Sequence, residues 1–127
     1  MIVKKILVID DEADIREVAK LSIEINSNWE VLSAHSGESG FSLARTHGPD
    51  AILLDVMMPD MDGLTTLAKL QSHPETLNIP VILLTAKVQS AEQRRYAKLG
   101  VAAVLTKPFD PVLLVEQIAG VLNWNQS

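Results

Sequence analysis

The chain alternates short, mostly apolar runs with longer stretches in which apolar residues recur every three or four positions. Each run is four residues long, as in a strand buried on both faces of a sheet. The longer stretches repeat like amphipathic helices, and the first contains Ile15, Val18, Leu21, Ser22 and Ile25. Strands are predicted at residues 6–9, 31–34, 51–54, 81–84 and 102–105, and helices at 15–25, 40–45, 64–70, 91–99 and 112–122.

These five alternations predict an α/β fold. Parallel strands joined by right-handed helical crossovers form a doubly wound sheet with helices on both faces. Ligands of such sheets bind beyond the carboxyl ends of the strands. The residues that end the strands are therefore the candidates for a functional site.

Composition and charge exclude several classes of protein. The 127 residues suit one domain, and the net charge of −5 comes without the basic cluster that direct nucleic-acid binding needs. The absence of cysteine excludes disulfides and thiolate metal sites. His35, His47 and His73 lack ligand spacing and are interpreted as surface residues. Because the first apolar run is too short for a signal peptide or membrane span, we expect a cytoplasmic protein without membrane contact.

Polar residues follow four of the predicted strands. They are Asp10, Asp11 and Glu12 after the first strand, Asp55 after the third, Thr85 after the fourth and Lys107 after the fifth. The acids of the first group could simply cap the next helix, and Asp60 and Asp62 are assigned to a turn and a cap. Asp55 is harder to explain structurally, because a carboxylate that ends an apolar central strand is costly unless it is paired.

Together these residues suit the transfer of a phosphoryl group onto Asp55. The carboxylates of Asp10, Asp11 and Asp55 repel one another and call for a cation. Oxygen ligands without His or Cys select a hard ion, so the expected metal is Mg²⁺ or Mn²⁺. The metal and Lys107 would offset charge on the phosphoryl oxygens, and the Thr85 hydroxyl can donate to the same oxygens. We therefore expect Asp55 to be a metal-assisted nucleophile.

Four segments resemble the signature segments of response-regulator receiver domains of two-component signalling. They are VIDDE at 8–12, LLDVMMPDMDG at 53–63, LLTA at 83–86 and LTKPF at 105–109. Their order and spacing match the family over nearly the whole chain. The resemblance implies a flavodoxin-like (βα)5 fold with strand order 2-1-3-4-5. We expect residues 1–127 to form one receiver domain without an output domain, because the chain ends shortly after the last predicted helix.

The resemblance implies a phosphoacceptor role for Asp55. Its donor would be a phosphohistidine on a sensor histidine kinase or a histidine phosphotransfer domain. Thr85 and Lys107 would bind the phosphoryl oxygens. A cis peptide bond between Lys107 and Pro108 would aim the lysine into the site.

The resemblance also implies a set of Mg²⁺ ligands. Asp11 and Asp55 would bind the ion directly, together with the backbone carbonyl of Met57. Asp10 would act through a metal-bound water. A phosphohydrolase of the haloacid-dehalogenase type normally has a second acid at the position of Met57, so we expect a signalling module rather than an enzyme.

The expected output is a population shift in the face formed by the fourth helix, the fifth strand and the fifth helix, which would bind a downstream protein. One residue departs from the family here. Receivers usually carry Tyr or Phe three residues before the lysine, where this chain has Val104. Since an aliphatic side chain has no ring to swing inward, the readout is expected to differ. A receiver-like docking module that acts independently of phosphorylation is the alternative.

The fifth predicted helix has a core-facing arc and an outer side. The arc consists of Leu114, Val115, Ile118, Val121 and Leu122. Leu113 and Trp124 fall on the other side and could be exposed anchors for a partner. Alternatively, Trp124 folds back over the helix end as a local plug.

Overall fold

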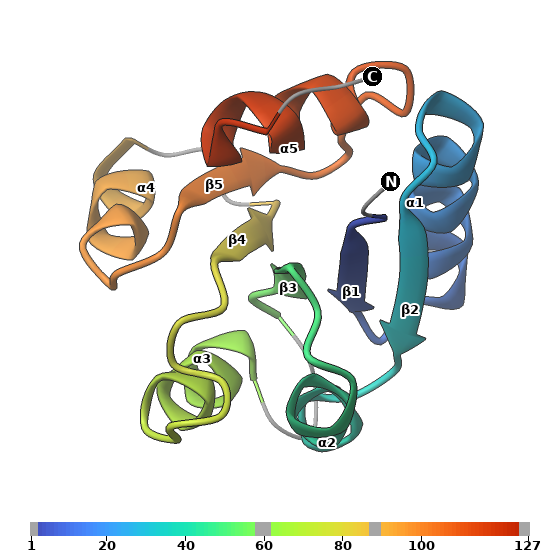
Figure 1. Ribbon diagram of the computed structural model, residues 1–127. Helices are drawn as coiled ribbons and strands as arrows, with labels where there is room; N and C mark the ends of the chain where they lie inside the picture. The colour runs from blue at the N-terminus through green and yellow to red at the C-terminus, as the bar shows by residue number, and fades with distance from the viewer. Residues whose placement is uncertain (1–2, 58–61, 87–89, 125–127) are drawn as a thin grey trace.

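The computed structural model describes residues 3–57, 62–86 and 90–124, which form one parallel sheet with helices on both faces (Figure 1). The strands are β1 Lys5–Ile9, β2 Glu30–Ala34, β3 Ala51–Asp55, β4 Val81–Thr85 and β5 Ala103–Thr106. The helices are α1 Ala13–Asn26, α2 Gly37–His47, α3 Gly63–Gln71, α4 Ser90–Ala97 and α5 Leu114–Leu122. The strand order is β2-β1-β3-β4-β5, so the predicted doubly wound fold is confirmed.

The two faces of the sheet carry separate hydrophobic clusters. Successive side chains of a strand point to opposite faces, and β1 divides accordingly. Ile6 and Val8 pack with α1 and α5, whereas Leu7 and Ile9 pack with α2 and α3 (Figure 1). The strand order reverses between β1 and β3, which places the switch point beside the carboxyl ends of these two strands.

Only part of the apolar stripe that predicts α1 lies on the buried face of this helix. Ala19, Ser22 and Ile23 are its buried residues, whereas Val18 is 40%, Leu21 47% and Ile25 77% exposed. The buried face combines the small residues Ala19 and Ser22 with Ile23, whereas most of the predicted stripe lies on the outer side. None of the helices within the described residues is long and apolar enough to cross a membrane.

The end of α5 decides between the two alternatives for Trp124. Its ring meets the buried Trp29 edge-on, with centroids 5.2 Å apart, and Lys4 Nζ lies 4.8 Å from its centroid. Trp124 therefore plugs the core and is not an exposed anchor. Leu113 is exposed as expected, but so is Val121, and the prediction that Val121 faces the core was wrong. Ala119 is buried in α5 and takes the core-facing position that was predicted for Val121.

Candidate functional site

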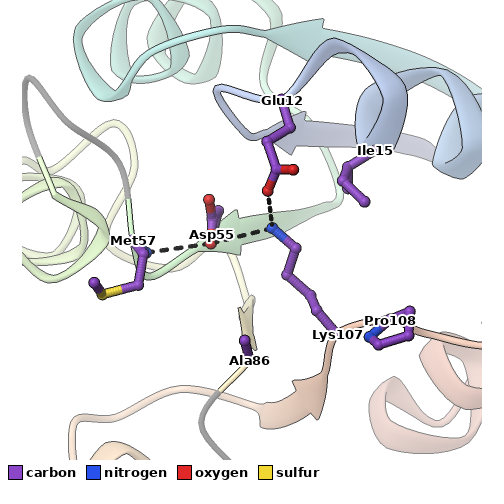
Figure 2. A pocket seen from close by; sticks show the side chains of 7 residues that line it. All are labelled: Glu12, Ile15, Asp55, Met57, Ala86, Lys107 and Pro108. Atoms are coloured by element: carbon purple, nitrogen blue, oxygen red, sulfur yellow. Dashed lines mark hydrogen bonds and ion pairs between the residues drawn. The ribbon is translucent and has the colours of Figure 1, made fainter.

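The polar residues predicted at the strand ends come together in one crevice. Asp10 follows β1, Asp55 ends β3 and Thr85 ends β4, and all three are buried. Lys107 follows β5, and its Nζ lies 3.0 Å from Asp10 Oδ2. The same Nζ lies 3.5 Å from Asp55 Oδ1 (Figure 2). The backbone N–H of Lys107 donates to the Thr85 carbonyl at 2.9 Å, which ties the start of the loop after β5 to β4. Through its ion pairs with Asp10 and Asp55, the lysine side chain bridges β1 and β3, the two strands at the switch point.

Four carboxylates surround this point. Ligand oxygens of Asp10, Asp11, Glu12 and Asp55 all lie within 4.8 Å of one another. Asp55 Oδ1 accepts the Met57 N–H at 3.2 Å, but the buried Oδ2 has no hydrogen-bond partner within the described residues. A buried carboxylate oxygen without a partner is costly. The donor set therefore fits a hard divalent cation such as Mg²⁺.

Glu12 takes part in the site in a way that sequence patterns missed. Its carboxylate does not cap α1 and instead lies 3.2 Å from Lys107 Nζ (Figure 2). The Glu12 backbone N–H donates to Asp10 Oδ1 at 2.9 Å. Lys107 thus has three carboxylate neighbours, of which Asp10 and Asp55 were predicted as residues of the site and Glu12 was not. The signal was present in the sequence as a third consecutive acid, but capping explained it equally well.

The electrostatics of the crevice disfavour a charged Asp55. Burial, followed by the negative charge of Asp10, raises the pKa of Asp55 from 3.8 to about 6. The Met57 N–H and Lys107 oppose this shift without cancelling it. Burial alone would lower the pKa of Lys107, but its hydrogen bond to Asp10 and the nearby acids outweigh burial and raise it. A further cation in the crevice would stabilise the ionised Asp55 carboxylate.

The pocket above Asp55 combines this polar floor with an apolar rim. The cavity has a volume of about 340 Å³ and is lined by Glu12, Ile15, Asp55, Met57, Ala86, Lys107 and Pro108 (Figure 2). The peptide bond between Lys107 and Pro108 is cis, as expected. Met57 is 63% exposed at the mouth of the pocket. The space can admit a phosphoryl group beside the Asp55 carboxylate.

The start of α3 packs tightly against the end of β3. The Gly63 N–H donates to the Val56 carbonyl at 2.9 Å, and a Cβ on Gly63 would lie 2.1 Å from the Asp55 carbonyl oxygen. Asp62 caps α3 by accepting the Thr65 N–H at 2.7 Å, and this hydrogen bond lowers the pKa of Asp62. Its predicted capping role is confirmed, whereas Asp60 lies outside the described residues.

We expect Gly63→Ala to destabilise the protein by about 2 kcal/mol, because the methyl group collides with backbone atoms that cannot rotate away. Gly120→Ala is the matched control in α5, where a Cβ meets nothing within 4 Å. That change should be neutral or stabilising, since Ala favours helices over Gly. Urea unfolding of both variants measures the difference. Equal stabilities would contradict the close approach of α3 to β3.

Other predicted residues lie away from the crevice. His35 and His47 are exposed, and His73 is half-buried against the Phe41 ring with centroids 4.7 Å apart. Val104 is half-buried in β5 beside Leu83 of β4. None of these four approaches Asp55 through a contact among the described residues.

Comparison with known proteins identifies close relatives. The chain matches the Response regulator receiver domain family over residues 6–119. It is 42% identical over 116 residues to Response regulator PleD of Caulobacter vibrioides, covering 90% of this chain and 25% of that protein. It is 35% identical over 123 residues to Transcriptional regulatory protein SrrA of Staphylococcus aureus, covering 97% and 49%. The chain thus spans a quarter to about half the length of these curated relatives.

A solved structure agrees with the fold. Chemotaxis protein CheY4 of Vibrio cholerae superposes with a TM-score of 0.86 at 25% sequence identity, covering 94% of this chain and 99% of that one.

Proposed function

The chain belongs to the response regulator receiver domain family, and on this premise we propose that Asp55 is its phosphoacceptor in a two-component phosphorelay. One observation carries the choice of residue. Asp55 Oδ2 is buried at the floor of the pocket and has no hydrogen-bond partner within the described part of the chain. It is therefore the Asp55 oxygen whose lone pairs are not taken up by a hydrogen bond, which supports its choice as the nucleophile.

The chemistry is a displacement at phosphorus. Asp55 Oδ2 forms the new O–P bond while the N–P bond of the donor phosphohistidine breaks and the imidazole leaves. Lys107 turns from the acids toward the phosphoryl oxygens, and the Thr85 hydroxyl donates to them. Both groups offset the negative charge that the transferred group brings into the crevice.

The ion that fits this crevice is Mg²⁺, with Mn²⁺ as a substitute. Asp10, Asp11, Asp55 and the Met57 backbone carbonyl would hold it. When bound, the ion supplies positive charge that offsets the carboxylates and the phosphoryl oxygens. The close group of acids and the unpartnered Asp55 oxygen support this assignment.

Intact-mass measurement after incubation with acetyl phosphate tests this function. We expect a single phosphoryl adduct in the presence of Mg²⁺ and none when a chelator removes the metal. Absence of the adduct from folded protein with Mg²⁺ would favour the docking module that acts without phosphorylation.

The outer side of α1 supports a protein as the natural donor. Ile15 lines the pocket, and the exposed Val18, Leu21 and Ile25 continue from it along α1. Val112 of the β5–α5 loop is 72% exposed, and it lines an apolar groove together with these three residues of α1. Exposed apolar groups that continue a reactive pocket indicate a contact surface.

The charges beside this stripe indicate what the donor presents. Two exposed acids on α1, Glu17 and Glu24, directly precede Val18 and Ile25, whereas one exposed base, Lys20, directly precedes Leu21. A second copy of α1 would bring these acids toward one another, so they disfavour self-association. The donor surface that fits is a helix with an apolar stripe and basic residues beside it, as part of a kinase or phosphotransfer domain.

Replacing Leu21 and Ile25 with serine should slow transfer from a phosphorylated histidine phosphotransfer domain by about tenfold, because two apolar contacts are lost. The rate with acetyl phosphate should not change, since that donor needs no docking surface. Leu77→Ser, at a residue that is 50% exposed and lies between α3 and β4, is the control. Equal slowing with both donors would rule out a docking role.

The output is a population shift of the face formed by α4, β5 and α5, which binds a downstream protein. Thr85 ends β4 two residues after Leu83, which pairs with Val104 of β5. Val104 packs against the hydrophobic cluster that contains Tyr96 of α4. This packing offers a route from the site to α4 that needs no aromatic ring in β5.

Amide hydrogen exchange measures this shift. We expect phosphorylation to change exchange in α4 and β5 by more than in α2, because α2 packs mainly on β1, β2 and α3 rather than on the strand that Thr85 ends. Unchanged exchange in α4 and β5 of the phosphorylated protein would contradict the proposed output face.

A further inference from the structure

A buried serine on α1 has an unusual hydrogen-bond partner. Ser22 lies in the second half of α1 and is 5% exposed. A serine inside a helix commonly returns its hydroxyl to the carbonyl four residues earlier. Ser22 Oγ instead donates to the carbonyl oxygen of Pro111, 89 positions away. The hydroxyl thus joins α1 to the loop between β5 and α5.

The loop that Ser22 holds begins with Lys107. At its start, the Lys107 N–H donates to the Thr85 carbonyl at 2.9 Å. Phe109 is buried in the core beside α1 and α5. Asp110 accepts the Val112 N–H at 2.9 Å and so shapes the turn locally. The bond from Ser22 to Pro111 adds an anchor from another element.

Two polar contacts, besides the apolar packing of Phe109, join α1 and its N-cap to this loop. One is the ion pair of Glu12 with Lys107 at 3.2 Å, and the other is the Ser22 bond, about 15 Å further along the helix. The ion pair has to open when Lys107 turns toward a phosphoryl group. The neutral bond of Ser22 lies outside the pocket and can persist throughout.

We propose that Ser22 is a positioning residue for phosphoryl transfer, because its bond to Pro111 holds the loop that carries Lys107. The inference rests on the proposed function of Asp55. A lysine side chain is long and flexible, so the reach of its Nζ depends on where its backbone is held. Small displacements of a catalytic group cost rate. Mg²⁺ binding should be unaffected, since its ligands lie on β1, β3 and the residues that follow them.

The test compares phosphorylation rates with acetyl phosphate at saturating Mg²⁺. Ser22→Ala should lower the rate about tenfold and leave the Mg²⁺ dissociation constant, measured by calorimetry, unchanged. Ser22→Thr keeps the hydroxyl and should restore most of the rate. Thr76→Val is the matched control, because it removes another buried hydroxyl, which donates to the Leu70 carbonyl at 2.6 Å remote from Lys107. Its rate should equal that of the unmodified protein.

A double-mutant cycle separates positioning from general destabilisation. In a Lys107→Ala background, Ser22→Ala should cause no further loss, since no lysine remains to be positioned. Equal losses with and without Lys107, an unchanged rate in Ser22→Ala, or a failure of Ser22→Thr to restore the rate would each overturn the proposal. If the unmodified protein forms no adduct, the proposed function itself fails. A normal adduct with no effect of Ser22→Ala refutes only the role of Ser22.

Discussion

Asp55→Asn is expected to abolish the phosphoryl adduct, whereas Asp62→Asn should form it normally. Asparagine preserves the shape of the side chain but replaces the nucleophilic carboxylate oxygen with an amide. In the wild type this oxygen, Oδ2, is buried with no hydrogen-bond partner among the described residues. The loss should therefore be complete rather than partial.

Asp62 is a matched control for this change. It lies seven residues from Asp55, and its replacement by Asn removes one negative charge as well. Asp62 is exposed and caps α3, and Asn caps helices about as well as Asp. Intact-mass analysis with acetyl phosphate and Mg²⁺ compares the two variants. An adduct of equal occupancy in Asp55→Asn would place the phosphoacceptor elsewhere, with Asp10 and Asp11 as the next residues to replace.

The second large effect is a pH-dependent gain in stability for the same Asp55→Asn variant when metal is absent. The pKa of Asp55 is about 6 in the folded protein, above its ordinary value of 3.8. Well below pH 3.8 the carboxyl is protonated in both the folded and unfolded states and contributes no difference. As the pH rises from 3.8 to about 6, the unfolded state releases a proton that the folded state still binds, and stability is lost.

Above pH 7 the loss is complete and amounts to about 3 kcal/mol, since each pKa unit corresponds to about 1.4 kcal/mol. Asparagine resembles the neutral acid and avoids this loss. With a chelator present, we expect Asp55→Asn to be more stable than the wild type at pH 7 and similar to it at pH 4. Urea unfolding at the two pH values measures the difference.

Mg²⁺ provides the complementary experiment. It should stabilise the wild type at pH 7, because a ligand that binds only the folded state adds its binding free energy. It should have little effect at pH 4, where Asp55 is protonated and cannot be a ligand. A wild type and variant with the same pH dependence between 4 and 7 would show that Asp55 is not the strained carboxylate of this site.

The sequence by itself determined the type and order of the elements and much of the site. Apolar runs and helical spacing act over a few residues, so they identify strands and helices without knowledge of the rest of the chain. Parallel strands place their carboxyl ends on one edge of the sheet. The meeting of Asp10, Asp55, Thr85 and Lys107 could therefore be predicted from four positions spread over nearly 100 residues.

The tertiary structure decided which faces and which partners these elements use. A periodic stripe shows that Val18, Leu21 and Ile25 share a side of α1, but not whether another element covers that side. Trp124 became a plug because Trp29 from a distant segment lies beside it. The Glu12–Lys107 ion pair and the Ser22–Pro111 bond each join residues more than 85 positions apart. Such contacts depend on how the elements pack against one another, and local sequence patterns carry no information about that arrangement.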